Sequence, residues 1–468
     1  MKTIQKMSAG VFVFFLCLPL AAQEALGDPP ATGAPPADTA GAASGEDSRL
    51  AIIKYGTETE IAALIQTLKN EGADYLDNEI AALAENTHNQ KILKGAFDFF
   101  AEREKGGLED RAIRAIEDRD DEAHETVLSA IEYLGKLKEE KAAPILREVL
   151  DAEERRFMNA AFRSLGKISG SGGGASDEAA EYLVDYYTNR EPGDENRRDV
   201  ITALGATGSA QGVSFLAELA LDNEERIPLR IAALDSLSKI ADPAGLDAIL
   251  ACVSVNDPNV RSAAVAALGP FSGDAVDKAI IEAFRDSYYR TRIAAAQASR
   301  QRKLAAAVPY LKFRAERDDV ANVKDEAIRA LGAIGNSEAM PVLETLFTGR
   351  KNADRARLVS AEMLMENAPG QYLDRLIAEF DEAKQKKQTS LCNGFLKILG
   401  QTRTENMADI SRRLMQSKEV AEKSCGLDIA ANNSLVSLAE EIKVIAADKN
   451  ESLARKARRT AEKLGIGL

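Results

Sequence analysis

The sequence contains no tryptophan, and aromatic residues make up only 5% of its 468 residues. A core with so few large rings must depend on Ala, Leu and Ile, and these suit closely packed helices better than sheets. The sequence also lacks sustained alternation of apolar and polar residues bounded by turn dipeptides, which is the usual signal of strands. We therefore predict an all-α protein.

Residues that commonly carry chemistry are equally scarce. There are two histidines, His88 and His124, and four cysteines, with no Cys-x-x-Cys or His-Glu-x-x-His motif for a metal. The Gly-x-Ser-x-Gly motif of a serine nucleophile is missing as well. The net charge of −14 argues against nucleic acid as a partner. We predict no enzymatic activity, no cofactor and no metal site.

The one strongly apolar run lies at the N-terminus. Lys2 and Lys6 precede the apolar residues 11–20, and Ala22 offers a small residue at a cleavage site. The run is too short for a membrane span, which needs about 20 apolar residues. Large apolar residues precede Cys17, so a lipid anchor is not expected. We predict a signal peptide over residues 1–22 and export to the periplasm or cell envelope.

Two segments have the composition of linkers. Residues 23–48 are rich in Pro, Ala, Gly and acidic residues, which predicts a disordered linker before a folded region over residues 49–468. Residues 169–177 form a Gly/Ser-rich insert. This insert is either a surface loop or a hinge between segments 49–168 and 178–468.

A repeated pattern dominates the rest of the chain. A Leu-Gly pair recurs about every 33 residues, and we use its Leu as an anchor. The anchors or their aligned equivalents are Leu134, Leu165, Leu204, Leu237, Leu268, Ser299, Leu331, Leu364, Leu399, Asn432 and Leu464. They define eleven units, and residues 49–105 are predicted to add degenerate N-terminal cap helices.

Each unit is predicted to be a pair of amphipathic helices. In one unit the helices are joined by a turn at residues 256–259, and Pro258 falls near the start of the second helix, where its missing N–H is harmless. Gly269, after the anchor Leu268, is expected to end that helix in a left-handed conformation. A pair of this size cannot bury its own apolar face, so the units must stack into an α-solenoid.

The motif Asp257-Pro258-Asn259-Val260-Arg261-x-x-Ala264-x-x-Ala267-Leu268-Gly269 resembles the HEAT repeat family, particularly the short bacterial HEAT-like repeats first associated with phycobilin lyases. The resemblance implies that a basic residue seven places before each anchor pairs with acidic residues of the preceding turn, such as Asp257, and so forms a ladder. Its members here are Arg197, Arg230, Arg261, Arg292, Lys324 and Arg357. The next two units carry Cys392 and Cys425 there, so the ladder is expected to stop.

The thiols allow two interpretations. Cys392 and Cys425 lie one repeat apart, and a disulfide between them requires that both point into the interface. Otherwise they are small buried hydrophobic residues. Cys252 lies in an apolar run and is expected in the core.

The exposed face of the second helices can be sampled two residues before each anchor. In the resembling family these helices line the concave surface. The residues at this position form a row that comprises Arg163, Thr202, Asp235, Ala266, Gln297, Arg329, Glu362 and Lys397. The row alternates in charge and polarity, which favours a protein partner over a polyanion or lipid.

Tyr288, Tyr289 and Arg292 are a candidate binding hot spot. Aromatic residues are few, and neighbouring turns do not place them between the two helices of a unit. Tyr and Arg are enriched in binding hot spots. The alternative is that both rings pack over neighbouring turns and stabilise the edge of the repeat.

These observations predict an exported, non-enzymatic scaffold or adaptor that binds protein partners in the bacterial cell envelope. One alternative is a lyase- or chaperone-like protein that handles a small ligand, which would need a Cys or His lining a concave pocket. Another is a structural, cell-wall-associated envelope protein.

Overall fold

The computed structural model describes residues 43–170, 174–190 and 192–468, and within them it contains 26 α-helices and no strand. The odd-numbered helices are α1 Ala43–Tyr55, α3 Asp77–Asn86, α5 Glu109–Glu117, α7 Ala143–Asp151, α9 Gly174–Arg190, α11 Val213–Leu221, α13 Leu246–Cys252, α15 Asp274–Ala283, α17 Val308–Arg317, α19 Ala339–Thr348, α21 Pro369–Gln385, α23 Met407–Met415 and α25 Ala439–Ala446. The even-numbered helices are α2 Glu58–Glu71, α4 Gln90–Glu102, α6 His124–Leu137, α8 Arg155–Ser169, α10 Asp194–Thr207, α12 Ile227–Ile240, α14 Pro258–Ala267, α16 Tyr289–Arg302, α18 Ala321–Ile334, α20 Asp354–Asn367, α22 Thr389–Gln401, α24 Val420–Asn432 and α26 Glu451–Lys463. Five short 3-10 helices accompany them at Glu140–Ala142, Ala210–Gly212, Pro243–Gly245, Ala305–Ala307 and Val436–Leu438.

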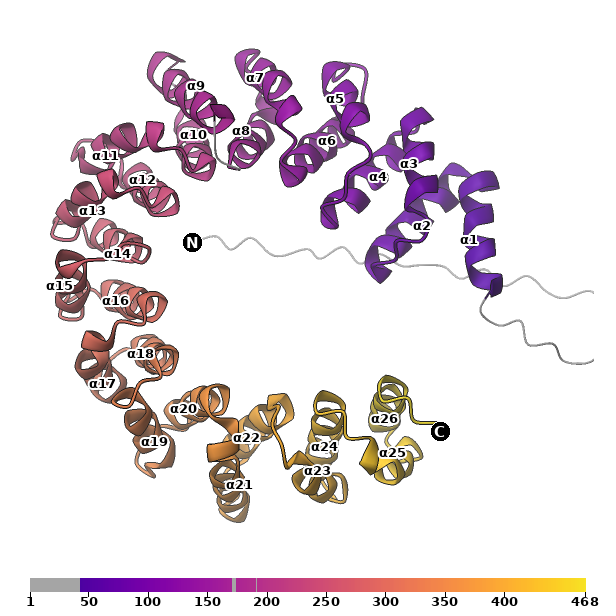
Figure 1. Ribbon diagram of the computed structural model, residues 1–468, viewed down its shortest axis with the longest axis vertical. Coiled ribbons are helices and arrows are strands. Elements are labelled where there is room, and N and C mark those ends of the chain that lie inside the picture. Colours follow the sequence, from indigo (N-terminus) through magenta and orange to yellow (C-terminus); the bar gives the residue numbers. More distant parts are fainter. Residues whose placement is uncertain (1–42, 171–173, 191) are drawn as a thin grey trace, which may run out of the picture.

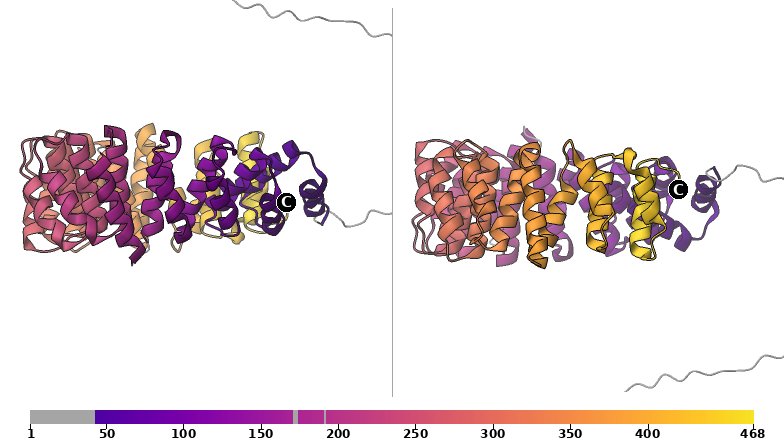
Figure 2. Two further views of the ribbon diagram at one scale, coloured as in Figure 1. Left: turned by 90° about the horizontal axis from the view of Figure 1, so that it is seen from above. Right: turned by 90° about the horizontal axis from the view of Figure 1, so that it is seen from below.

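The helices form antiparallel hairpins that stack side by side into an open C-shaped arc (Figure 1). The second helix of each pair lines the inner side of the arc and the first helix lies outside (Figure 1). Seen edge-on, the arc is a band one helix length wide (Figure 2). The hairpins from α5/α6 to α25/α26 are the eleven predicted units, and α1–α4 lie upstream of them. The predicted α-solenoid is therefore confirmed.

The start of α14 shows how the repeat sequence produces its helix. The Asp257 carboxylate accepts hydrogen bonds from the backbone N–H groups of Asn259 and Val260, and Pro258 occupies the first turn. An acidic cap satisfies N–H groups that have no partner within the helix, and proline there sacrifices none. The predicted role of Pro258 is confirmed.

The left-handed conformation predicted for the glycine after an anchor occurs at Gly465, where φ is 67° just past the end of α26. Gly269 lies just past the end of α14 but does not have a positive φ, and most other glycines of this kind have a different role. Gly166 and Gly205 lie inside α8 and α10, not at their ends. A Cβ on Gly166 would lie 2.6 Å from the carbonyl oxygen of Ala203, so the glycine permits close contact between successive inner helices. Other left-handed helix ends lie away from the anchors, for example at Gly208 and Gly335.

Polar side chains also connect successive inner helices. Ser236 Oγ donates to the Ile201 carbonyl oxygen at 2.9 Å. Asn432, which replaces the anchor leucine, donates through Nδ2 to the Gly400 carbonyl oxygen at 2.9 Å. Because buried polar groups need partners, these bonds fix the relative position of neighbouring repeats. The apolar core runs through the stack, with a smaller second cluster at the C-terminal end.

The predicted boundaries are partly tested by the helix limits. Helix α1 begins at Ala43, so the last residues of the segment predicted as a 23–48 linker are helical, a correction to that boundary. The predicted signal peptide, residues 1–22, lies outside the described residues. No helix within the described ranges is long and apolar enough to cross a membrane.

Helix packing continues across the Gly/Ser-rich insert. Helix α8 ends at Ser169 and α9 begins at Gly174, so part of the predicted 169–177 insert is helical. Asn159 Nδ2 in α8 donates to Asp199 Oδ2 in α10 at 2.7 Å. Direct contact of α8 with α10 makes the inner layer continuous between these two helices, and a hinge at residues 169–177 stays a prediction.

Candidate protein-binding surface

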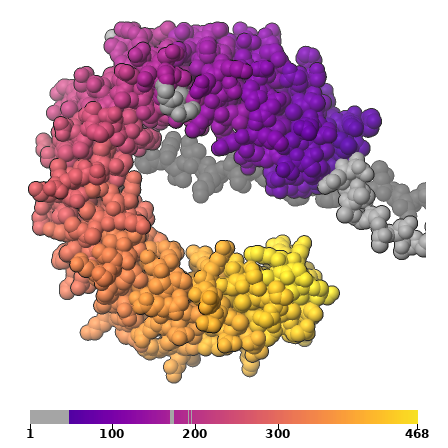
Figure 3. All heavy atoms as spheres, in the orientation of Figure 1, coloured from indigo at the N-terminus to yellow at the C-terminus, as the bar shows by residue number. Residues whose placement is uncertain are grey.

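The inner side of the arc exposes the side chains that the sequence pattern assigned to it. The eight residues of the predicted row, among them Arg163, Gln297 and Lys397, are exposed or half-buried on the even-numbered helices, whereas Ala430, two places before the anchor Asn432, is buried. The arc leaves a broad open space on this side (Figure 3). Some charges are neutralised by the next repeat, as where Arg329 Nη1 donates to Glu362 Oε2 at 3.3 Å. The surface is therefore mixed in charge.

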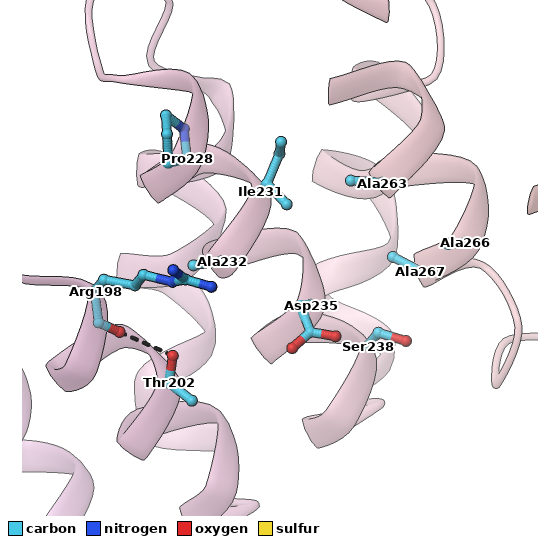
Figure 4. A pocket seen from close by; sticks show the side chains of 10 residues that line it. All are labelled: Arg198, Thr202, Pro228, Ile231, Ala232, Asp235, Ser238, Ala263, Ala266 and Ala267. Carbon is cyan, nitrogen blue, oxygen red and sulfur yellow. Dashed lines mark hydrogen bonds between the residues drawn. The ribbon is translucent and has the colours of Figure 1, made fainter. Parts of the chain in front are cut away.

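A hollow of about 400 Å³ lies on this inner surface, where α10, α12 and α14 meet. We call it the inner hollow. It is lined by Arg198, Thr202, Pro228, Ile231, Ala232, Asp235, Ser238, Ala263, Ala266 and Ala267 (Figure 4). Three of its residues, Thr202, Asp235 and Ala266, belong to the row predicted from the sequence.

The inner hollow has an apolar floor and a charged rim. Small side chains create its space, because Ala263, Ala266 and Ala267 fill little of the gap beside α12. Arg198 extends from α10 toward α12 (Figure 4). On α12, Asp235 lies 2.7 Å from Lys239 and both are largely exposed. The inner hollow therefore offers an apolar surface between an exposed cation and an exposed anion.

The arginine ladder exists, but its register differs from the predicted one. Arg261 does not pair with Asp257, which caps α14. Its Nε and Nη2 instead donate to Asp286 of the next repeat at 2.8 and 3.1 Å. Its Nη1 donates to the carbonyl oxygens of Val255 and Asn256 in its own turn. Arg261 therefore joins two successive turns, which supports a structural role for it.

Further rungs follow the same rule, from one repeat to the next. They are Arg197 with Glu225, Arg292 with Asp318 and Asp319, and Arg357 with Glu379. Lys324 forms no ion pair with another described residue. Cys392 and Cys425 occupy the next two ladder positions, as the sequence pattern indicates, but Lys423 Nζ, close to the second of them, lies 2.7 Å from Asp448. Sequence inspection missed this rung because Lys423 lies two places before the expected position.

At Arg230 the ladder is incomplete, because no described carboxylate pairs with this arginine. It is 5% exposed, and its Nε donates to the Ala220 carbonyl oxygen at 3.0 Å. Its Nη2 atom has no hydrogen-bond partner in the described part of the chain. Val255 lies 25 residues after Arg230, the separation between Arg261 and Asp286. Val255 thus occupies the position that Asp286 occupies beside Arg261 in the neighbouring repeat.

Arg292 is unsuited to the partner-binding role predicted for it. Its side chain is 6% exposed, and Nε and Nη2 each donate to Asp318 at 2.8 Å. Burial alone would raise the pKa of Asp318, but hydrogen bonds from Arg292 and from the Val320 N–H outweigh it and lower that pKa below its usual value. The arginine is committed to a buried ion pair.

Tyr288 contacts the preceding repeat, as the alternative interpretation proposed, whereas Tyr289 contacts its sequence neighbours Tyr288 and Arg290. Both tyrosines are half-buried and their rings meet edge to face at 5.4 Å. Tyr288 Oη donates to Asn259 Oδ1 of the preceding repeat at 3.0 Å, and Arg290 Nε donates to Tyr289 Oη at 3.2 Å. The Tyr288 bond links two repeats and so supports a stabilising role for that ring, whereas a binding role for Tyr289 stays a prediction.

All three described cysteines are free, so Cys392 and Cys425 are not bridged. Cys425 donates through Sγ to the Leu396 carbonyl oxygen at 3.1 Å, and burial raises its pKa to about 12. Cys252 is also buried. Thiols with raised pKa values are poor nucleophiles at neutral pH, which fits a packing role.

Comparison with known families identifies the repeat. The model of the family described as "Spirochaete HEAT repeat protein" matches residues 53–460, most of the chain. The chain belongs to this family. The predicted HEAT repeat resemblance is thereby confirmed, and the match extends over α2–α25 and most of α26, so it includes nearly all of the cap helices as well as the eleven units.

Several solved structures are similar to this chain at low sequence identity. One is the karyopherin Kap121p bound to the extreme C-terminus of the protein phosphatase Cdc14p, with 12% identity, a TM-score of 0.43, and coverage of 89% of this chain and 53% of that one. The chain therefore spans about half the length of Kap121p. An engineered protein matches with 16% identity, a TM-score of 0.32, and coverage of 84% of this chain and 99% of that one. None of the curated proteins compared with the sequence matches it.

Proposed function

We propose that this chain is a non-enzymatic scaffold that binds a protein partner through the inner surface of the arc, with the inner hollow as the main contact. The inner hollow is the observation that supports this proposal. It combines apolar area with one cation and one anion on its rim, and interfaces between proteins are built from such apolar centres with polar edges.

The lining of the inner hollow favours a protein over a small reactive ligand. A ligand-handling protein of the predicted alternative class would present a Cys or His in a concave pocket. None of the ten described residues that line the inner hollow is of either type. Its alanine floor leaves room for an apolar side chain of a partner, which is how hot spots are commonly anchored.

We further propose that the protein is exported and works in the periplasm or cell envelope. The support is the N-terminal sequence, with two lysines, a short apolar run and a small residue at position 22. N-terminal sequencing of the mature protein should begin near Gln23. A retained Met1, or a lipid attached to Cys17, would contradict export by this route.

Filling the inner hollow tests the binding proposal. Ala266 is exposed, so Ala266→Arg should fold normally while its long side chain occupies the space that a partner needs. Ala251→Arg is the matched control, because Ala251 is exposed on α13, the outer helix of the same hairpin. In affinity capture from an envelope extract, Ala266→Arg should lose proteins that wild type and Ala251→Arg retain. Equal capture by all three would refute the proposed surface.

A further inference from the structure

The first and last hairpins of the arc each leave one side of the stack without a neighbouring hairpin among the described residues. Helix α14, inside the stack, packs against α12 and α16. Helix α26 packs against α24 and α25, and α1 packs against α2 and α3, but no described helix precedes α1 or follows α26. We call the exposed side chains of residues 48–79 the N-end surface and those of residues 439–468 the C-end surface.

Both end surfaces point in the same direction. Helices α1 and α26 lie at the two tips of the C-shaped arc, and both tips face its open side (Figure 1). Seen edge-on, the two tips lie within the same band (Figure 2). A second arc, rotated by half a turn in the plane of the first, therefore places its N-end surface opposite the C-end surface of the first arc, and the reverse.

The N-end surface has an excess of unpaired negative charge. Glu58 and Glu60 at the start of α2 and Asp74 before α3 are exposed, and none of the three forms an ion pair with another described residue. The Thr57 N–H donates to Glu60 at 2.8 Å and lowers the pKa of that carboxyl, so it is charged at neutral pH. Lys54 is also exposed there, which leaves three unpaired acids against one cation.

The C-end surface has the opposite charge. Four cations of α26 are exposed and form no ion pair with another described residue, namely Arg455, Arg458, Arg459 and Lys463. The exposed acids of the same helix are Glu451 and Glu462. On a protein of net charge −14 this basic end is unusual, and complementary charges of this kind steer association and select the partner surface.

Lys463 shows that the C-end surface does not accept a further hairpin of the same kind. In two interior units the residue before the anchor is a buried alanine, Ala267 or Ala330. In α26 the same position holds Lys463, which is exposed. Covering a cation costs free energy unless an anion pairs with it, so the C-end surface requires an acidic partner surface.

Both end surfaces also expose apolar side chains. Among the large hydrophobic side chains of the described residues, the three most exposed are Tyr55 at 86%, Val444 at 74% and Leu468 at 65%. Tyr55 lies on the N-end surface, and Val444 and Leu468 lie on the C-end surface. Apolar side chains among charged ones are the usual composition of a contact between proteins.

We propose that two copies of the chain close into a ring, in which each N-end surface docks on the C-end surface of the other copy. Most soluble homo-oligomers have closed symmetry, and two-fold dimers are the commonest. Once one pair of ends has docked, the other pair meets at high effective concentration, so two modest contacts give a stable dimer. Each contact brings the acids of one copy to the arginines of the other.

Charge reversal tests this pairing. The N-end variant carries Glu58→Lys and Asp74→Lys, and the C-end variant carries Arg455→Glu and Arg459→Glu. In a ring of identical copies each variant places like charges opposite each other, so each should weaken dimerisation at least about tenfold at low ionic strength. The N-end variant also has a net charge closer to zero than −14, so general repulsion between copies cannot explain its loss of dimer.

Mixing the two variants is the sharpest measurement. The N-end variant has two basic ends and the C-end variant has two acidic ends, so an equimolar mixture should form one-to-one dimers that neither forms alone. Analytical ultracentrifugation of the full chain at several concentrations gives the mass, and circular dichroism checks that each variant is folded. The control carries Lys312→Glu and Arg317→Glu, which reverse two exposed charges on the outer helix α17. It should dimerise as wild type does.

Four outcomes would overturn the proposal. A wild type that is monomeric at every concentration would show that the end surfaces are solubilising caps. Oligomers larger than a dimer would contradict the closed ring. Dimers that survive in both variants would place the contact elsewhere, and a mixture that stays monomeric would contradict the complementary pairing. Ala266→Arg should dimerise as wild type does, so this proposal and the inner-hollow proposal can fail separately.

Discussion

Replacing Arg292 by methionine removes one of the two most buried complete rungs of the ladder while keeping most of the side-chain volume. The Asp318 side chain is fully buried, and after the substitution it keeps only the Val320 N–H at 3.0 Å and Arg314 at 3.3 Å. Removing one partner of a buried ion pair costs about 3–5 kcal/mol, because the remaining charge stays buried. We expect a loss of this size in the free energy of unfolding.

Two companion variants separate the ion pair from packing. Arg261→Met breaks a rung whose partners are 16% and 13% exposed, so water can compensate in part and the loss should be smaller, about 1.5–3 kcal/mol. Combining Arg292→Met with Asp318→Asn removes both charges and should recover part of the stability, because no unpaired carboxylate remains.

Denaturant unfolding followed by circular dichroism measures these differences, provided that the slope of each transition is unchanged. Arg285→Met is the surface control and should leave the midpoint unchanged, since its pair with Glu282 is largely exposed. If Arg292→Met is no more destabilising than Arg285→Met, the structural role of Arg292 is wrong. Intact stability with lost partner binding would restore the partner-binding prediction for this residue.

Two other predictions concern the same ladder. Val255→Asp should raise the melting temperature, because it supplies the carboxylate that Arg230 lacks. Ser254→Asp is the control and should not raise it, because Ser254 is exposed and one residue away. Equal effects of the two substitutions would contradict the explanation that Arg230 lacks a carboxylate partner. The pKa values of Asp286 and Asp318 are lowered in the folded state. Their contribution to stability is therefore fully present above the unfolded-state pKa of about 4, and it is lost as the pH falls through their folded-state pKa values. Melting temperatures measured from pH 7 to pH 2 should therefore fall below about pH 4, and less so in Asp318→Asn; an equal fall in that variant would show that other groups dominate.

Much of the fold could be predicted from the sequence because the same residue pattern recurs in successive repeats. The recurring anchor gave the number of hairpins, and the turn around Asp257 gave the helix start. The position two residues before the anchor also identified the inner surface. Repetition averages out the local ambiguity that limits predictions for a single helix.

Contacts between repeats were harder to predict, because spacing along one repeat does not reveal which neighbour a side chain reaches. Arg261 was assigned to the carboxylate four residues before it, yet its side chain reaches Asp286, 25 residues later. Gly166 was expected at a helix end, but the closeness of Ala203 on the next inner helix determines its role. The inner hollow was also missed, although Ala232 and Ala263 at the same position of successive repeats are a readable signal for it.

The most direct test of the proposed scaffold function is site-specific photo-crosslinking from the inner hollow. A photoreactive amino acid at position 266, on the inner surface of α14, is compared with the same group at position 251, on the outer helix of that hairpin. After irradiation in envelope extract, the proposal predicts a discrete protein adduct from position 266 that is missing from position 251. Equal labelling from both positions, or labelling from position 251 alone, would contradict binding through the inner surface.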